Sequence, residues 1–424
     1  MRNFPIIILL LISRFTLGQE NSILFEDQIY KPQIATVLLY PNIGEPENPK
    51  RLISPPITSL QNNNGLILEF DDLSNDYNTY KAKIFHCTSD WIKSNLNDIE
   101  YTFEYNEYPI TEQEQSFSTK VPYYHYRFQL PKLKISGNFV VVVYNSNREP
   151  VFSRRFMLYD SRINITAKAR FSQGIQQQFS DQQIDFTIDY KALNLAAPQT
   201  DLKIIMRQNF RWDKTRTGFK PSNVRPFDKL LEYTFFDLEN TFPGGNEFRY
   251  LDSRSLSGRG YGVSDMERTS DYTKLILFTD KSRTDNGYLQ LDDLNGMFIV
   301  DQRESGRGST DADYTPVLFT LKTEEDAHAA YYVNGGFNYW NLNERNRLTF
   351  NPDTGLYEVE ILLKQGVINY DYVQKIGNTA NESSIEGDYA STENDYDILV
   401  YYKPPAGRSE LLVGYTTVEW NRRR

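Results

Sequence analysis

Apolar and polar residues alternate with a period of two along much of the chain. In residues 163–171 the apolar side chains share one face, namely Ile163, Ile165, Ala167, Ala169 and Phe171. Residues 184–190 repeat the pattern, with an apolar face of Ile184, Phe186, Ile188 and Tyr190 opposed by Asp and Thr. Such half-buried strands are typical of antiparallel sheets with one solvated face. No stretch keeps a 3.6-residue period over four turns, so the pattern predicts strands and few helices.

Two further stretches support this prediction. Residues 139–144, FVVVVY, are a short continuous apolar run rich in β-branched residues, which predicts a strand buried on both faces. Residues 351–355, NPDTG, combine a proline that presets one turn angle with a glycine that tolerates the left-handed position. This segment therefore predicts a hairpin. The fold class expected is all-β, with about three tandem immunoglobulin-like β-sandwich domains.

Changes in composition indicate where the domains divide. We expect an N-terminal sandwich over 19–160, a middle sandwich over 161–313 and a C-terminal immunoglobulin-like (E-set-like) sandwich over 314–424. The polar stretch 303–313, RESGRGSTDAD, is typical of a linker or exposed loop and marks the second boundary. Residues 378–394 are predicted to be a mobile loop within the last domain.

The first eighteen residues have the pattern of a secretory signal peptide. Arg2 supplies the charged start, residues 6–12 are an unbroken apolar run, and Gly18 offers a small residue for cleavage. Seven apolar residues are too few for a spanning helix, which needs about 20. We therefore expect an exported mature chain with no transmembrane segment, and with one cysteine it can form no internal disulfide.

The overall charge disfavours one class of partner. The net charge is −10, from 46 basic and 56 acidic residues. Nucleic-acid binding depends on neutralising phosphates with basic side chains, so we expect no nucleic-acid partner.

One short stretch, residues 81–96, looks reactive because the only cysteine lies beside one of three histidines. Adjacent side chains of a strand point to opposite faces, so His86 and Cys87 are not expected to form a nucleophile–base pair or to share a metal. Ser89 or Asp90 is expected to cap a short helical turn over residues 91–96.

The remaining candidates for chemistry are weak. The histidines have no zinc-site spacing, and residues 258–262, GRGYG, lack the lysine and the strand–loop–helix context of a phosphate loop. The acidic pairs at 71–72 and 292–293 are adjacent in sequence, which does not place two carboxyl groups across a cleft as glycoside hydrolysis requires. We expect both pairs in solvated turns. The sequence predicts no catalytic residues, no metal, no cofactor and no small-molecule substrate, hence no enzyme.

A glycan-binding module is the alternative function. Residues 331–341 and the following hairpin resemble immunoglobulin-like modules that bind starch or glycogen, in which exposed aromatic rings stack on sugars. Phe337, Tyr339 and Trp340 would be the stacking residues here, or they would pack a sandwich core. This resemblance concerns a scaffold, and a fold does not fix a function.

A more specific resemblance covers nearly the whole mature chain. The stretches that carry it, in order, are VLLYP (37–41), ILEFDDL (67–73), IFHCTSDW (84–91), SGNFVVVVY (136–144), PVFSRRFML (150–158), RQNFRWD (207–213), FPGGNEFRYLDSRSL (242–256), GGFNYW (335–340) and NDYDILVYYKPPAGRSELLVGY (394–415). Together they resemble the plug proteins of the type IX secretion system, formerly a domain-of-unknown-function family. The chain departs from that pattern at Phe210, where a glycine is expected.

The resemblance implies a location, a partner and a role. Plug proteins lie in the periplasm against the inner mouth of the giant outer-membrane translocon barrel, and they close it when no substrate is moving. We expect the same localisation, partner and non-enzymatic function here. Because Arg and Trp tend to dominate interface energies, we predict partner contacts by Arg211, Trp212, Asn246 and Arg249. The competing interpretation is that Gly244 and Gly245 form a turn that Arg249 braces.

Overall fold

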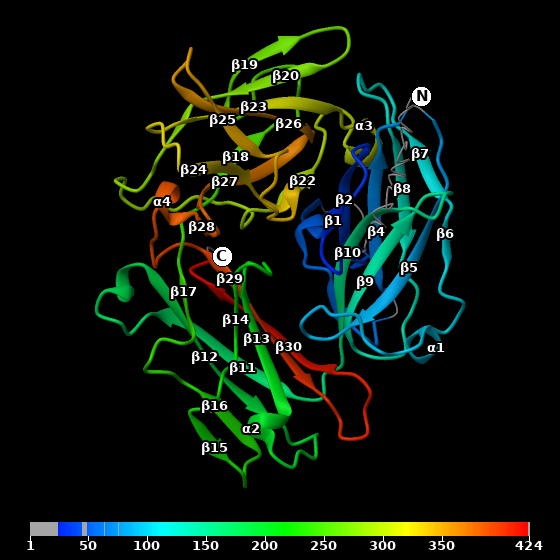
Figure 1. Ribbon diagram of the computed structural model, residues 1–424, viewed down its shortest axis with the longest axis vertical. Helices are drawn as coiled ribbons and strands as arrows, with labels where there is room; N and C mark the ends of the chain where they lie inside the picture. Colours follow the sequence, from blue (N-terminus) through cyan, green and yellow to red (C-terminus); the bar gives the residue numbers. More distant parts are fainter. Residues whose placement is uncertain (1–23, 45–48, 63, 75, 423–424) are drawn as a thin grey trace, which may run out of the picture.

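The chain is all-β, as predicted, and its strands form five sheets in the part described (Figure 1). The computed structural model describes residues 24–44, 49–62, 64–74 and 76–422, so the predicted signal peptide at 1–18 lies outside them. Three large clusters of buried side chains lie between or against these sheets. In the described residues, no helix is both long enough and apolar enough to cross a membrane.

The first pair of sheets is formed by residues 24–160, which we call the N-terminal sandwich. One sheet has the order β1–β10–β9–β5–β6 with β3 beside β10, and the other has the order β2–β4–β8–β7. The strand bounds are β1 Gln28–Ile29, β2 Ile34–Pro41, β3 Ile57–Ser59, β4 Leu66–Asp72, β5 Tyr80–Cys87, β6 Tyr108–Ile110, β7 Glu112–Gln115, β8 Tyr124–Gln129, β9 Gly137–Tyr144 and β10 Pro150–Tyr159.

The β9 strand confirms the prediction of a strand buried on both faces. Its odd-numbered apolar residues, Phe139, Val141 and Val143, join the core between the two sheets. Val140 and Val142 face the other way and pack in a smaller cluster. β9 lies between β10 and β5, so its backbone groups can pair on both sides. Because both faces of the strand are buried, apolar side chains are favourable at every position.

The second pair of sheets contains the predicted alternating strands. One sheet has the order β11–β12–β16–β15 with β17 beside β12, and the other has the order β14–β13–β29–β30. The bounds are β11 Asn164–Phe171, β12 Asp181–Asp189, β13 Leu202–Gln208, β14 Thr215–Thr217, β15 Asn223–Arg225, β16 Leu230–Tyr233, β17 Thr241–Pro243, β29 Asn394–Tyr402 and β30 Leu411–Trp420. In β12 the predicted inner residues Ile184, Phe186 and Ile188 are all buried.

The last two strands of the chain belong to this second pair of sheets and not to a separate C-terminal sandwich. β13 pairs with β29 along its whole length, from Leu202 opposite Tyr402 to Gln208 opposite Tyr396. Figure 1 shows the red β29 and β30 beside the green β13. The strand pairing therefore crosses the boundary predicted at 313. We call residues 161–248 with 394–420 the middle sandwich, and residues 249–393 the insert.

The insert is one strongly curved sheet of eleven strands. Its main order is β18–β27–β24–β25–β26–β23–β20–β19, with β22 and β28 beside β27 and β21 beside β23. The bounds are β18 Arg249–Asp252, β19 Val263–Arg268, β20 Thr273–Leu277, β21 Asp280–Lys281, β22 Phe298–Val300, β23 Tyr314–Lys322, β24 Ala329–Asn334, β25 Arg347–Asn351, β26 Leu356–Lys364, β27 Gly366–Ile376 and β28 Thr379–Asn381. The predicted hairpin joins β25 to β26, and Gly355 has the expected left-handed backbone with φ +67°.

Helices are short and confined to connections. Their bounds are η1 Pro49–Ile53, α1 Asp98–Tyr101, η2 Gln177–Phe179, α2 Pro198–Asp201, α3 Gly308–Asp311, η3 Gly336–Asn338 and α4 Ser383–Glu386. The helical turn predicted for 91–96 is absent from that segment. The chain instead folds back after Cys87, where Trp91 has φ +61°, and α1 begins after a capping box formed by Asn97 and Glu100.

Two segments predicted as exposed or mobile loops are packed against the rest of the molecule. In 303–313, the α3 region contacts the N-terminal sandwich, since Tyr123 Oη donates to the Ala312 carbonyl at 2.8 Å. In 378–394, the α4 helix buries Ile385 and Glu386. The first part of each segment is exposed, as predicted, whereas residues 310–313 and 385–394 are mostly buried or half-buried because other parts of the chain cover them.

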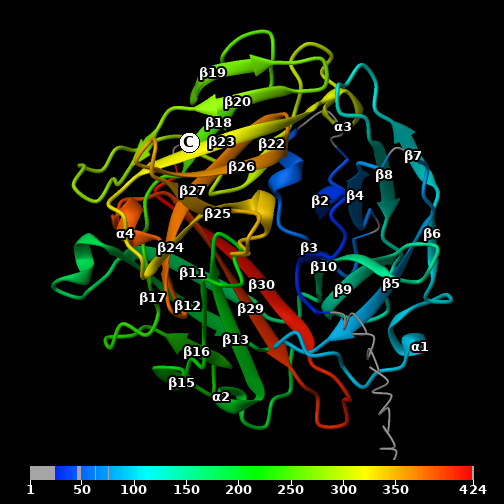
Figure 2. The same ribbon diagram turned by 45° about the horizontal axis from the view of Figure 1, so that its top comes forward.

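The three parts lie packed against one another (Figure 2). Leu38 and Tyr40 of β2 point away from the N-terminal core and join the core of the insert. On the other side, Met157 of β10 packs with Leu399 and Tyr401 of β29. The N-terminal sandwich therefore buries an outer face of each of its sheets, one against the insert and one against the middle sandwich.

Candidate functional site

The Cys87 region has no reactive geometry. His86 packs its ring against Phe139 at 5.0 Å between centroids, whereas Cys87 lies in the cluster with Val140 on the opposite face of β5. Burial lowers the pKa of His86 to about 4 and raises the pKa of Cys87 to about 12. At neutral pH the imidazole is uncharged and the thiol is protonated, so neither group is prepared for nucleophilic chemistry.

The same stretch instead helps to form a junction between the N-terminal and middle sandwiches. Trp91 and Trp212 meet edge to face, with 4.9 Å between their ring centroids. The Arg155 guanidinium lies 5.3 Å and 5.4 Å from the two rings, and the Arg207 guanidinium lies 4.2 Å from Trp212. Asp90 adds an ion pair to Lys203 at 2.7 Å. We call this arrangement the arginine–tryptophan junction; it borders a cavity of 350 Å³.

Arg211, one of the predicted contact residues, connects this junction to the insert. Its guanidinium lies 3.7 Å from the Trp340 ring, and its Nη2 atom contacts Asp213 and Glu382 at 2.5 Å each. The side chain is only 3% exposed. Burial by itself would lower the pKa of Arg211, but Glu382 and Asp213 raise it above the usual value, so the charge is permanent.

The turn that carries Arg211 explains the departure at Phe210. Asn209 and Phe210 both have left-handed backbones, with φ +51° and +59°. Glycine adopts that conformation without a steric penalty, which is why a glycine was expected. The turn is held in this chain by hydrogen bonds between Asn209 and Asp395, with the two backbone N–H groups as donors.

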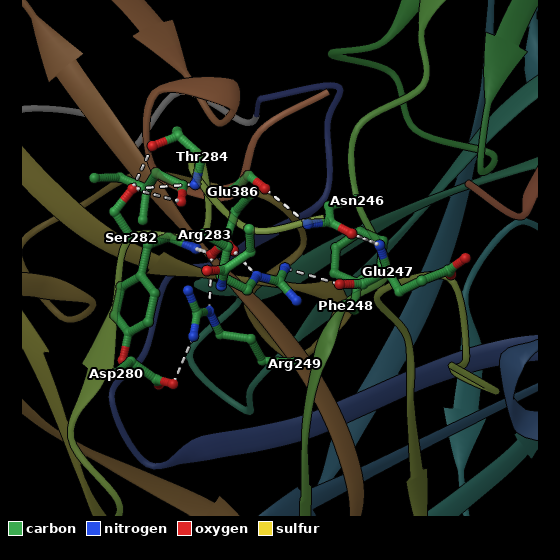
Figure 3. Close-up of polar contacts among 12 residues, drawn as sticks. Asn246, Glu247, Phe248, Arg249, Asp280, Ser282, Arg283, Thr284 and Glu386 are labelled. Atoms are coloured by element: carbon green, nitrogen blue, oxygen red, sulfur yellow. Dashed lines mark hydrogen bonds and ion pairs between the residues drawn. The ribbon is translucent and has the colours of Figure 1, made fainter. Parts of the chain in front are cut away.

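Asn246 and Arg249 lie in a second polar network, within the insert and its connection to the middle sandwich (Figure 3). Arg249 Nε contacts Glu386 Oε1 at 3.0 Å and Nη1 contacts Asp280 Oδ1 at 2.6 Å. Asn246 donates from Nδ2 to the Glu386 carbonyl at 2.8 Å. Glu386 Oε2 also accepts a hydrogen bond from Arg283 Nε at 2.6 Å. The Glu386 side chain is 4% exposed, so little water reaches it. Its charge is balanced by the guanidinium groups of Arg249 and Arg283.

The glycine pair before this network forms a close approach, in agreement with the competing interpretation. A Cβ atom on Gly244 would lie 2.1 Å from the Tyr389 carbonyl oxygen, so the position excludes any larger residue. Gly245 has φ +67° and its N–H donates to Asp388. Arg249 braces the same region through Glu386. Direct partner contact by the four predicted residues is not tested by this geometry and stays a prediction.

A buried ionic cluster joins the N-terminal sandwich to the insert, and the sequence did not predict it. Asp71, at the end of β4, accepts hydrogen bonds from His125 at 2.7 Å, Tyr314 at 2.6 Å and Lys364 at 2.6 Å. Asp71 is 1% exposed and the Lys364 side chain 2%. Burial would raise the pKa of Asp71, but Lys364 and His125 hold it below its usual value.

The pair at 71–72 is therefore not in the solvated turn predicted for it, whereas Asp292 of the second pair is exposed, as predicted. Asp72 is fully buried and accepts the Tyr80 hydroxyl at 2.8 Å, on the side of β4 opposite to Asp71. Asp293 accepts backbone N–H groups, and burial raises its pKa to about 7. Asp71 and Asp72 point away from each other, so they do not form the facing carboxyl pair that glycoside hydrolysis needs.

The three aromatic residues considered for sugar binding are occupied by the protein itself. Arg154 covers the Tyr339 ring at 4.1 Å, and the Tyr339 hydroxyl donates to the Val37 carbonyl at 3.0 Å. Trp340 lies beneath Arg211. Phe337 packs against the core of the insert. Stacking on a sugar requires an open ring face, and these contacts use the faces that the alternative function needs.

The polar contacts described above hold parts of the chain together. The described residues contain no group of three side chains that could hold a metal ion. Buried ion pairs and arginine–aromatic contacts connect each pair of parts. The Asp71 cluster joins the N-terminal sandwich to the insert, the arginine–tryptophan junction joins it to the middle sandwich, and Arg211 joins the middle sandwich to the insert. Sequence reasoning missed Lys364, Glu386 and Trp91 as junction residues. The local signal was a charged residue within the last two positions of a strand, as at Asp71 in β4 and Lys364 in β26.

Comparisons with known proteins agree with this architecture. Residues 34–160 match the family model described as type 9 secretion system plug protein 1st domain, and the match ends one residue after β10. The crystal structure of a hypothetical protein from Parabacteroides merdae superposes with a TM-score of 0.88 at 31% identity, over 94% of this chain and 100% of that chain.

A second solved structure adds no information about the fold. It contains manganese lipoxygenase of Gaeumannomyces graminis and part of zonadhesin of Komagataella pastoris, and it aligns over 92% of this chain and 93% of that chain. Its TM-score is 0.15 at 8% identity, which carries no argument. No curated protein matches the chain.

The family match covers the first sandwich, and a relative at 31% identity covers the rest with the same fold. On these grounds the chain belongs to the plug protein family of the type 9 secretion system.

Proposed function

We propose that this protein is a non-enzymatic plug that docks on the periplasmic mouth of the giant outer-membrane translocon barrel and closes it when no substrate is moving. The observation that carries the proposal is the plug-family match over residues 34–160, which form the N-terminal sandwich. The protein acts from the periplasm, which its predicted signal peptide would allow it to reach.

The construction of the molecule supports a steric role. A plug resists the passage of solutes only if its own parts do not separate. Here the N-terminal sandwich is fixed to the insert by the Asp71 cluster and to the middle sandwich by the arginine–tryptophan junction. Separating either junction would leave charged side chains unpaired in a poorly hydrated place, which is strongly unfavourable.

The predicted contact residues fit this proposal in a supporting role. Arg211 and Arg249 are nearly buried and fully engaged with carboxylates of the same chain. We propose that they hold loops 209–213 and 244–249 in the shape that meets the barrel. Trp212 is half-buried, as are Asn246 and Arg249, and we propose that the part of its ring left open by the arginine–tryptophan junction contacts the barrel directly.

Affinity purification tests the docking partner. A tagged copy of the full chain, recovered from membranes in mild detergent, should bring the translocon barrel with it. Recovery of the tagged chain alone, with the barrel present in the same membranes, would contradict the proposal.

The contact prediction needs its own variants. Trp212→Ala should reduce the recovered barrel, because it removes an aromatic group at a proposed contact. Arg259→Ala is the matched control, since its ion pair with Asp265 is 62% and 60% exposed and lies in another loop. If the Trp212 variant melts like the wild type and still recovers the barrel fully, direct contact at Trp212 is wrong.

A further inference from the structure

A long groove separates β2 of the N-terminal sandwich from β26 of the insert. It has a volume of 960 Å³, at the upper end of the range for ligand pockets. Its walls are runs of consecutive residues, namely 34–36, 341–346 and 359–364. Side chains of a strand alternate between two faces, so a strand that lines a cavity with consecutive residues presents its edge to that cavity.

The β26 edge that faces the groove has no partner strand. β23 pairs with β26 along residues 357–364. On the other side β25 pairs only with residues 356–358. In the described part of the chain, residues 359–364 are therefore paired on one side only. Six residues of strand correspond to an open edge of about 20 Å.

The register shows which backbone groups point into the groove. Opposite residues of an antiparallel pair alternate between exchanging two hydrogen bonds and exchanging none. Gln365 N donates to the Asp313 carbonyl at 2.9 Å, which sets the phase of the alternation. Leu362 then lies at a non-bonded position, opposite Pro316, which has no N–H to donate. The N–H and C=O groups of Glu360 and Leu362 are consequently directed away from β23.

Side chains around the open edge define the chemistry of an occupant. Ile34, Val359 and Ile361 give the groove an apolar wall, and Leu362 is 47% exposed. Among the charged lining residues, Glu344 pairs with Arg347 and Glu360 pairs with Lys274. Lys364 pairs with Asp71.

Arg345 is the exception among these charges. It lies exposed in the groove wall and has no ion pair in the described chain. Charge complementarity therefore favours an occupant with a carboxylate near Arg345. An unpaired strand edge in an apolar groove is the arrangement that accepts an added strand.

We propose that this groove binds an extended peptide segment of a partner protein, which adds to β26 as a strand. The segment carries apolar residues at alternate positions and an acidic residue that pairs with Arg345. Main-chain hydrogen bonds to Glu360 and Leu362 provide the registration, and the apolar wall selects the side chains. The inference goes beyond the proposed sealing role, since it holds whichever partner supplies the strand.

Peptide binding to the full mature chain tests the proposal. The probe is a fluorescein-labelled synthetic decapeptide in which valine alternates with threonine, with glutamate at each end. It should bind in fluorescence anisotropy. The same peptide with alternate backbone amides N-methylated should bind at least about tenfold more weakly, because two or more backbone hydrogen bonds are lost. Equal binding of both peptides, or no binding of the first, would overturn the proposal.

Two variants of the protein locate the site. Leu362→Pro removes the outward N–H without removing a bond to β23, as proline is tolerated on strand edges. This variant should bind the peptide about tenfold more weakly than the wild type does. Leu362→Thr, which keeps the N–H, should reduce the affinity much less. Undiminished binding to a folded Leu362→Pro protein would exclude the β26 edge.

Charge exchange gives a test that does not depend on proline. The Arg345→Glu variant should bind the glutamate-ended peptide several-fold more weakly than the wild type does. The same variant should bind a lysine-ended version of the peptide more tightly than the glutamate-ended one. Exposed Arg345 makes no contact that the fold requires, so this variant should fold normally. If the variant and the wild type show the same preference between the two peptides, the acidic residue does not lie near Arg345. If binding to the Leu362→Pro protein is also unaltered, the peptide does not bind in this groove.

Discussion

Arg211 carries a permanent charge into a place with almost no solvent. It is stabilised there by Glu382, Asp213 and the face of Trp340. Removing the guanidinium leaves Asp213 without its cation and Glu382 with Lys214 alone, which costs more than the attraction is worth in an intact pair. The residue therefore contributes to the connection between the middle sandwich and the insert.

We expect Arg211→Ala to lower the free energy of unfolding by about 3 kcal/mol, at the lower end of the range for a broken buried pair because Asp213 is partly exposed. Arg259→Ala should change it little. Denaturant titration followed by tryptophan fluorescence measures both. If both substitutions change the free energy of unfolding equally, the Arg211 network does not stabilise the contact between the middle sandwich and the insert.

Asp71 should make the contact between the N-terminal sandwich and the insert sensitive to acid. Its folded pKa lies below the ordinary value because of Lys364 and His125, so its stabilisation is complete above the unfolded pKa of about 4. The stabilisation is lost as the pH falls through the folded pKa. Asp71→Asn removes this contribution and leaves Lys364 without its anion.

The variant should therefore be less stable than the wild type by about 3–5 kcal/mol at pH 7, and the difference should narrow as the pH falls below 4. Melting curves of both proteins between pH 7 and pH 3 measure the difference. A constant difference over the whole range would show that Asp71 does not titrate as proposed.

At the scale of elements, strand identity and strand partnership have different origins. The alternation in 184–190 predicts a strand and its buried face from local sequence alone. The hairpin at 351–355 also follows from local turn chemistry. The pairing of β13 with β29 joins residues about two hundred positions apart, and no local pattern specifies it. The division at 313 was predicted from a polar stretch whose second half, residues 309–313, is packed against the N-terminal sandwich.

This topology predicts how fragments behave. Residues 161–313 lack β29 and β30, so one sheet of the middle sandwich would lose half its strands, and this fragment should not fold. Residues 161–248 joined by a short linker to 394–420 contain both sheets and should give a cooperative melt. Circular dichroism and thermal unfolding distinguish them. A cooperative melt of 161–313 would instead support the boundary at 313.

At the scale of the whole molecule, the Asp71 cluster, the arginine–tryptophan junction and the Arg211 network connect three packed parts into one body. The N-terminal sandwich buries an outer face against each of its neighbours. A body of this kind can obstruct an opening without any chemical step, which is the reason the proposed role needs no catalytic residue.

Loss of the protein should accordingly make the outer membrane leaky. A strain that lacks it but keeps the barrel should become sensitive to large antibiotics that normally do not cross. Growth inhibition by such antibiotics measures the effect, and a plasmid copy of the gene should restore resistance. Sensitivity that stays at the wild-type level would contradict the sealing role, while leaving the docking experiment to be judged separately.

The sequence by itself determined the all-β class, the faces of individual strands, the hairpin before β26 and the separation of His86 from Cys87. These features depend on period-two geometry and turn chemistry, which act over a few residues. Only the tertiary structure decided that β29 completes the middle sandwich, that Asp71 is buried beside Lys364, and that the β26 edge is open. Each of these depends on which distant segment supplies a partner, or fails to supply one, and that is fixed by packing between parts of the chain that lie far apart in sequence.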